Sequence, residues 1–297
     1  MERPRPNEES ARRIGPYRLI TRLDPSSPPR SGHVPCRRFV ARSTEGDRTV
    51  LLSAPLPGAD PARFLTEAQE AQRLLGPWTA PVTEVADPGS PPFHATPYVP
   101  ALPLPVALAV HGGPLPEETV RVIGVALAET LAAAHAQGIT HAGVSPAAVL
   151  LTADGPRLTC FGAVRAAAPD GTRRSDLPGL DPGALAPEQA SGGRPRPPGD
   201  VYALGAVLAY ASTGHTAPER SELPAALRPS TASCLSRDPA DRPTAADVLA
   251  ALAPPTPHET VLGSAGSLLT PGWLPGRVVA ALARQSSEIL ATELPWN

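Results

Sequence analysis

The sequence predicts an α+β fold, in which short strands come first and helices follow. Segments 15–23, 39–42, 49–53 and 92–99 are short and rich in apolar and β-branched residues, as strands are. After residue 116 apolar side chains recur instead at helical spacing. A group of strands followed by a group of helices is typical of α+β proteins.

Two helices are indicated by the positions of their apolar residues. In the segment 62–75 the stripe is at i, i+4, i+7 and i+11, with Phe64, Ala68, Ala71 and Leu75. In the segment 116–138 it is at i, i+3, i+7 and i+11, with Val120, Ile123, Leu127 and Leu131. Pro116 and the acids after it suit a first helical turn. Each stripe predicts a helix with one buried face.

Composition excludes several classes of function. The 297 residues carry a net charge of −2, which gives no electrostatic case for binding nucleic acid or an anionic membrane. The longest apolar-looking run, 101–110, is short and contains Pro103 and Pro105, so no membrane insertion is expected. The first residues lack the apolar core of a signal peptide, and we expect a cytoplasmic protein.

The cysteines and prolines allow two further statements. Cys36, Cys160 and Cys234 are far apart in sequence without metal-ligand spacing, which predicts reduced, mostly structural thiols and no metal site. The 41 prolines cluster between the periodic segments, which favours a folded protein with stiff loops.

The central stretch His141-Ala-Gly-Val-Ser-Pro-Ala-Ala-Val-Leu-Leu151 is followed by Cys160-Phe-Gly162. It resembles the catalytic loop and metal-binding hairpin of bacterial serine/threonine protein kinases, H-R-D-L-K-P-x-N-x-L-L and D-F-G. The positions that match are His141, Pro146, Val149, Leu150, Leu151, Phe161 and Gly162.

The resemblance implies a two-lobed protein-kinase-like fold over 15–252. A small β-rich N-lobe would span 15–97 and a larger helical C-lobe 105–252. The hinge between them, 98–104 with Pro97, Tyr98 and Val99 at its start, would offer backbone groups to adenine, and Thr96 stands at the gatekeeper position.

The residues that carry kinase chemistry are replaced. Gly143 stands in the place of the catalytic aspartate, Ser145 of the loop lysine, Ala148 of the metal-binding asparagine and Cys160 of the metal-binding aspartate. Ser53 stands where V-A-V-K has its lysine, in Val50-Leu-Leu-Ser53. Phosphoryl transfer depends on holding metal, phosphates and acceptor in line. We therefore expect no catalytic or metal-binding residue, weak or absent ATP and Mg²⁺ binding, and no cofactor.

This expectation does not depend on the alignment. The sequence contains no lysine, so every one of the 26 basic residues is arginine. Asparagine occurs only as Asn7 and Asn297. The loop 24–35, which would cover the phosphates, has Gly32 as its only glycine. We interpret that loop as an ordinary surface hairpin.

Other family positions are retained. Glu67 stands where a glutamate pairs with the missing lysine, and it could bond to Ser53, meet an arginine or face water. Glu188 of Ala186-Pro-Glu188 and Arg242 match a structural ion pair, and Asp200 matches the aspartate that holds the catalytic-loop backbone. Residues 163–183 are expected to form a loop in the place of the activation segment.

The ends lie outside the resemblance. We expect a flexible arm at 1–14, a Pro-rich linker at 253–272, and a helical segment at 273–297 whose helix spans 277–291. Val279, Leu282, Ile289 and Leu290 would form its apolar side. This segment would lie against the C-lobe or complete a partner surface, with Trp273 as its anchor.

Three functional interpretations remain open. The first is a pseudokinase that acts as a scaffold or allosteric regulator by binding a protein, such as an active kinase or its substrate. The second is an ATP-dependent serine/threonine kinase or other phosphoryl or nucleotidyl transferase with relocated residues, which would use an arginine for phosphate and Asp154 or Asp170 for metal. The third is a structural domain fixed to a partner.

Overall fold

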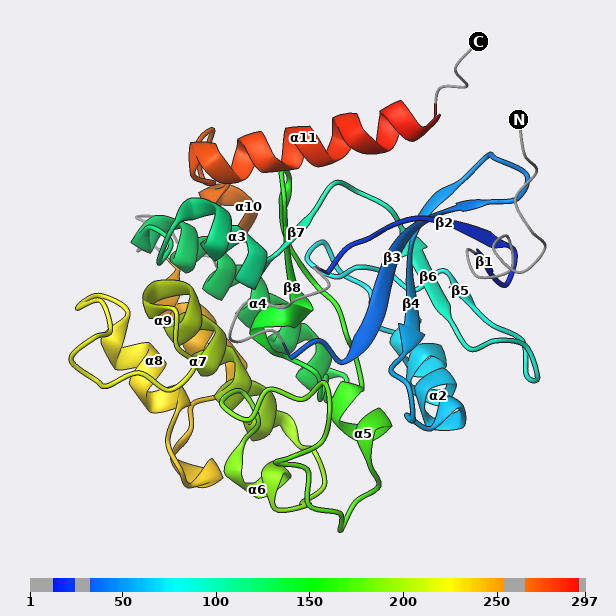
Figure 1. Cartoon of the computed structure of the whole chain (residues 1–297). Coiled ribbons are helices and arrows are strands. Elements are labelled where there is room, and N and C mark those ends of the chain that lie inside the picture. The colour runs from blue at the N-terminus through cyan, green and yellow to red at the C-terminus, as the bar shows by residue number, and fades with distance from the viewer. Residues whose placement is uncertain (1–12, 25–32, 254–264, 294–297) are drawn as a thin grey trace.

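The computed structural model describes residues 13–24, 33–253 and 265–293 (Figure 1). The predicted arm, except for Arg13 and Ile14, lies outside the described residues, as do Gly32 and most of the loop 24–35, which we interpret as a surface hairpin. A strand-rich lobe and a larger helical lobe form the described part of the chain (Figure 1). The predicted α+β, two-lobed architecture is confirmed.

The N-lobe is built on an antiparallel sheet with the strand order β1-β2-β3-β4-β6-β5. Its strands are β1 (Arg13–Ile14), β2 (Tyr17–Arg22), β3 (Cys36–Ser43), β4 (Thr49–Pro55), β5 (Glu84–Val85) and β6 (His94–Pro97). Five of the eight residues of β3 and six of the seven residues of β4 are buried. The register sets Arg38 opposite Ser53 across these two strands.

Helix α2 (Pro61–Ala71) packs beside this sheet. Asp60 caps its N-terminus by accepting hydrogen bonds from the backbone of Ala62 and Arg63, and Pro61 suits the first turn. The helix ends four residues earlier than predicted. Leu75 is consequently outside the helix and 73% exposed, and does not extend the apolar stripe.

The C-lobe begins with β7 (Leu102–Pro103), which pairs with β8 (Val149–Thr152) and then β9 (Gly155–Leu158). Its helical elements in the described residues are α3 (Leu104–His111), α4 (Glu117–Ala136), η1 (Pro146–Ala148), α5 (Ala163–Ala167), α6 (Pro187–Ala190), α7 (Pro197–Thr213), α8 (Arg228–Cys234), η2 (Pro239–Asp241) and α9 (Ala245–Leu252). Residues 163–167, predicted as loop, form the short helix α5.

Helix α4 is the centre of the C-lobe. All four residues of its predicted stripe are fully buried, and α7 and α9 pack against it. By length and composition alone α4 could cross a membrane, but 67% of its most apolar window is buried inside the lobe. Core helices of folded proteins have the same character, so this one feature is weak evidence for a membrane segment.

The C-terminal part lies against the kinase-like body. Residues 265–268 of the predicted linker form α10 (Ala265–Leu268), and α11 (Gly276–Glu293) follows. Trp273 is buried, and its indole N–H donates to the Ala153 carbonyl. The backbone carbonyl of Trp273 accepts a hydrogen bond from the Thr119 hydroxyl. The predicted apolar side was half right: Leu282 and Ile289 are buried, but Val279 and Leu290 are 50% and 58% exposed. Val278 and Ala281 complete the buried face.

Candidate functional site

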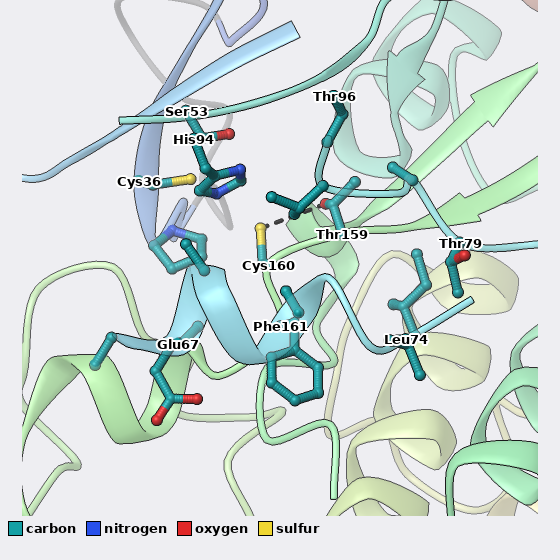
Figure 2. Close-up of a pocket in the computed structure, with 18 of the residues that line it drawn as sticks. Cys36, Ser53, Glu67, Leu74, Thr79, His94, Thr96, Thr159, Cys160 and Phe161 are labelled. Atoms are coloured by element: carbon teal, nitrogen blue, oxygen red, sulfur yellow. Dashed lines mark hydrogen bonds between the residues drawn. The ribbon is translucent and has the colours of Figure 1, made fainter. Parts of the chain in front are cut away.

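A pocket lies between the N-lobe sheet, α2 and the segment after β9 (Figure 2). Ser53, His94 and Thr96 line it from the sheet, and Phe161 and Cys160 line it from the C-lobe side. The remaining lining is mostly apolar, for example Leu74 and Ala68. This is the cleft in which the family resemblance places the phosphotransfer site.

Arg38 lies at the side of the cleft where the family resemblance places the phosphates. It faces the C-lobe from the strand next to Ser53, and its side chain is 1% exposed. Its Nε and Nη2 donate to the two carboxylate oxygens of Asp24 at 2.9 and 2.5 Å, and its Nη1 donates to the Ala147 carbonyl at 2.9 Å. The Arg38 charge is therefore neutralised within the protein, and its donors already have acceptors.

The side of the cleft next to the hinge is filled by a buried apolar cluster. Leu23 comes from the end of β2, Leu51 from β4, Ala101 from the hinge and Leu150 from β8. Leu51 stands at the alanine of V-A-V-K, so a larger side chain projects from the strand that would border adenine. Residues that pack against one another from both lobes leave little space there for a nucleobase.

Asp200 holds the catalytic-loop backbone. Its two carboxylate oxygens accept hydrogen bonds from the backbone N–H groups of His141 and Ala142, both at 2.7 Å. The His135 ring nitrogen Nε2 lies 3.0 Å from Oδ2. Ala142 has a φ of 52°, an unfavourable value that two buried hydrogen bonds stabilise. The loop thus keeps its scaffold although its chemical residues are gone.

Gly143 is packed directly against the backbone that follows β9. A Cβ atom at this position would lie 1.9 Å from the carbonyl oxygen of Cys160 and 3.2 Å from the amide of Ala163. Since both contacts are with backbone, no side-chain rotation relieves them. An aspartate in the place of Gly143 therefore requires the two segments to separate.

We expect Gly143→Ala to lower the free energy of unfolding by about 1 to 3 kcal/mol, because overpacking against backbone forces a local rearrangement. Gly276→Ala is the matched control, since a Cβ there meets nothing within 4 Å and alanine favours the first turn of α11. Urea denaturation of both variants tests this. Equal midpoints would contradict the close approach of the two segments.

The residues at the family's metal positions do not fit a magnesium ion. Ala148 is fully buried and has no oxygen in its side chain, and Cys160 offers sulfur, a poor partner for a hard cation. Within the described ranges, no group of three histidine, cysteine, aspartate or glutamate residues is placed to hold a metal. Ser145, at the loop-lysine position, is buried and begins η1.

Cys160 and Cys36, far apart in sequence, meet in this cleft (Figure 2). Thr159 Oγ1 lies 3.4 Å from the Cys160 sulfur. The neighbouring Cys36 thiol and the Arg38 guanidinium lower the pKa of Cys160 to about 7. The interaction with Cys160 and burial raise the pKa of Cys36. The interpretation of the cysteines as reduced, mostly structural thiols did not foresee that two of them line one pocket.

Glu67 meets an arginine, one of the three alternatives considered. Its Oε2 accepts from Arg165 Nε and Nη2 at 2.8 and 2.7 Å. Arg165 belongs to α5, and its guanidinium also lies 5.0 Å from the ring centre of Phe161. A Cβ on Gly162, whose φ is 71°, would lie 2.1 Å from that Glu67 oxygen. Glu67 therefore fastens α2 to the start of the activation segment and away from Ser53.

Glu188 and Arg242 contact each other in the C-lobe. The two guanidinium nitrogens donate to the two carboxylate oxygens at 2.8 and 2.9 Å. Arg242 also donates to the carbonyls of Ser236, Pro198 and Arg237. Its side chain is fully buried, whereas that of Glu188 is 33% exposed.

The carboxylates considered for a relocated metal site lie elsewhere. Asp154 is in the turn between β8 and β9 and lines a groove beside the Trp273 segment. Asp170 is paired with the buried Arg174 at 2.9 Å in the loop after α5. Neither of them lines the cleft pocket.

The hinge is contacted by the C-terminal helix. Gln285 of α11 accepts from the backbone N–H of Ala101 at 2.9 Å and donates to its carbonyl at 3.0 Å. The Tyr98 hydroxyl donates to the side-chain oxygen Oε1 of Gln285 at 3.2 Å. The next residue, Val99, is 44% exposed. Pro97 ends β6. Sequence reasoning missed Gln285, since nothing in a helix marks which residue will reach a distant backbone.

Comparison with known proteins assigns the family. The probable serine/threonine-protein kinase PkwA of Thermomonospora curvata is 36% identical over 292 residues, which cover 88% of this chain and 38% of that protein. The serine/threonine-protein kinase AfsK of Streptomyces coelicolor is 31% identical over 297 residues, 93% of this chain and 36% of AfsK. The chain belongs to the bacterial Hanks-type serine/threonine protein kinase family.

A solved structure agrees with this kinase-family fold. A point mutant of the kinase domain of Mycobacterium tuberculosis PknI superimposes with a TM-score of 0.59 at 20% identity, and the match covers 92% of this chain and 97% of the PknI domain. No protein-family model matches the sequence. The chain spans little more than a third of the length of PkwA and AfsK.

Proposed function

We propose that this kinase-family member is a pseudokinase, which performs no phosphoryl transfer and acts by contact with another protein. The observation that supports this best is the cleft itself. Beside the hinge it is packed by Leu23, Leu51, Ala101 and Leu150, and on the phosphate side the Arg38 charge is committed to Asp24. The chain also lacks the family's lysine, catalytic base and both metal ligands. Because these groups act as a unit in catalysis, their absence likewise argues against phosphoryl transfer.

The preserved parts support a role in binding. The pair of Glu188 and Arg242 and the backbone bonds of Asp200 maintain the C-lobe without serving chemistry. We propose that the partner is a protein, either an active kinase of the same organism or a substrate of one, and that the protein works in the cytoplasm. The relocated-transferase alternative has no support from the cleft pocket, since its carboxylates Asp154 and Asp170 lie outside it.

The decisive test is a melting curve with millimolar ATP, with and without Mg²⁺. A ligand at 100 times its Kd adds about 2.7 kcal/mol to the folded state, which moves Tm by several degrees. We expect no magnesium-dependent shift. An active kinase domain of the same family serves as the positive control, and it should shift under the same conditions.

We expect no shift for two reasons, the filled hinge side of the cleft and the missing phosphate and metal ligands, and Leu51→Ala separates them. The variant removes the side chain that fills the hinge side but restores no metal or phosphate ligand. It should allow at most a magnesium-independent response to adenosine. A magnesium-dependent rise of Tm in the unaltered protein, or phosphate incorporation that heat denaturation abolishes, would refute the proposal.

Partner binding is measured separately. A pseudokinase that regulates should bind an active kinase domain reversibly and with fixed stoichiometry, as measured by titration calorimetry. A change in the phosphorylation rate of that kinase on binding distinguishes a regulator from a purely structural domain.

A further inference from the structure

The two cysteines of the cleft come from different lobes. Cys36 is the first residue of β3 in the N-lobe sheet, and Cys160 follows β9 in the C-lobe. Both line the same pocket, and Figure 2 shows their side chains there. The two thiols are close enough to shift each other's pKa. A covalent bond between them would therefore join the lobes across the cleft.

The local backbone turns the Cys160 thiol toward the pocket. Cys160 has a φ of 62°, in the left-handed region that residues with a Cβ rarely adopt. Its thiol is oriented further by Thr159 Oγ1, which itself donates to the Ala148 carbonyl. Strained residues of this kind cluster at functional sites.

The two thiols differ in the way that a stepwise oxidation requires. Cys160 is partly exposed and Cys36 is buried. The neighbouring Cys36 and the Arg38 guanidinium lower the pKa of Cys160 to about 7, which favours its thiolate form. Cys234, by contrast, is buried in the C-lobe core and its pKa is raised to about 12 by desolvation.

We propose that Cys36 and Cys160 form a redox-modifiable dithiol site, which a small hydroperoxide such as H₂O₂ converts to a disulfide across the cleft. The Cys160 thiolate attacks one peroxide oxygen, the O–O bond breaks, and hydroxide leaves and takes up a proton as water. Cys160 is then a sulfenic acid. The Cys36 sulfur attacks the Cys160 sulfur, an S–S bond forms, and the S–O bond breaks. The departing hydroxide takes the Cys36 proton as a second water.

The electrons balance in this sequence. Each thiol sulfur gives up one electron, and the peroxide accepts both as its O–O bond is reduced to two waters. A thiol reductant reverses the reaction by exchange at the disulfide. In the oxidised form β3 and the segment after β9 are tied together, so the lobes can no longer open at the cleft. This inference goes beyond the proposed function and does not depend on it.

The test uses the full chain, fully reduced and then exposed to stoichiometric H₂O₂. We expect the three free thiols to fall to one and the non-reduced digest to contain the Cys36 peptide joined to the Cys160 peptide. Dithiothreitol should restore all three. The oxidised protein should melt several degrees above the reduced one, because the bond closes a long loop.

Matched variants assign the two roles. Cys234→Ser should form the same joined peptides at the same rate. Cys36→Ser should leave a sulfenic acid on Cys160 that dimedone traps, and Cys160→Ser should abolish rapid reaction with peroxide. The peptide mapping of the unaltered protein stands even if a variant fails to fold.

Three results would overturn the proposal. They are persistence of all three thiols, further oxidation of Cys160 without a joined peptide, and joined peptides found only between two chains. Each of these would show that the two sulfurs do not react with each other within one molecule.

Discussion

Replacing Arg242 by alanine should lower the free energy of unfolding by about 3 to 5 kcal/mol, the cost of removing one partner of a buried ion pair. The arginine is fully buried, and its loss leaves the Glu188 carboxylate without its two donors. Three backbone carbonyls lose their donor as well. Because Glu188 is one-third exposed, water recovers part of this loss, and we expect the lower half of the range.

The matched control is Arg73→Ala, just after α2 on the exposed side of the N-lobe. Arg73 contacts Glu70 at 3.0 Å, but the two side chains are 69% and 55% exposed. An exposed pair contributes between zero and about 1 kcal/mol. Arg242→Lys keeps the charge without the bidentate geometry and should fall between the two. Guanidinium denaturation measures all three. Equal losses for Arg242→Ala and Arg73→Ala would show that the C-lobe pair does not stabilise the fold.

Acid should destabilise the protein between about pH 6.5 and pH 4 through His141. Both ring nitrogens of His141 are buried without a hydrogen-bond partner, and its ring packs edge-on against Phe161. Desolvation lowers its pKa from 6.5 to about 4, although Asp200 partly opposes the shift. The unfolded chain therefore binds the proton first as the pH falls.

The sign and size follow from this difference. Neutral His141 stabilises the fold fully above the pKa that this residue has in the unfolded chain. This stabilisation is lost as the pH falls through its pKa in the folded protein. At about 1.36 kcal/mol for each pKa unit, the loss comes to about 3 kcal/mol for His141. The pKa of His94 is lowered as well because of burial, but part of this residue's surface remains accessible in the pocket and it should contribute less.

Denaturation midpoints at several pH values test this. His141→Leu should have a smaller loss between about pH 6.5 and pH 4 than the unaltered protein, because leucine does not titrate. His215→Gln, at an exposed histidine, is the matched control for the loss of an imidazole. An identical pH dependence for His141→Leu and the unaltered protein would show that His141 does not cause the acid loss.

The cleft and the C-lobe differ in which family residues they keep. The residues that would do chemistry are replaced by small ones, whereas those that hold backbone are kept with near-ideal hydrogen bonds, as at Asp200. Gly143 even permits a closer approach of two segments than an aspartate would allow. At Gly143, the loop therefore packs directly against the backbone that follows β9.

The replacement of the family's catalytic residues and much of the framework could be predicted from the amino-acid sequence. A chain without lysine cannot place a lysine anywhere, whatever its fold. Helical periodicity found α4, because burial of one face imposes a 3.6-residue repeat that a local pattern displays. Glu188, Arg242 and Asp200 were identified through short motifs whose order in the chain is preserved, and their side chains make the contacts described above.

What fills the cleft, and which groups meet there, became visible only in the folded chain. Arg38 with Asp24, Cys36 with Cys160, and Glu67 with Arg165 join residues from separate elements, and Gln285 reaches the hinge from the C-terminal helix. No local pattern records such pairs, because they depend on how the two lobes and α11 pack together. Packing is set by the sum of many weak contacts between distant segments, while a motif reports only its own neighbourhood.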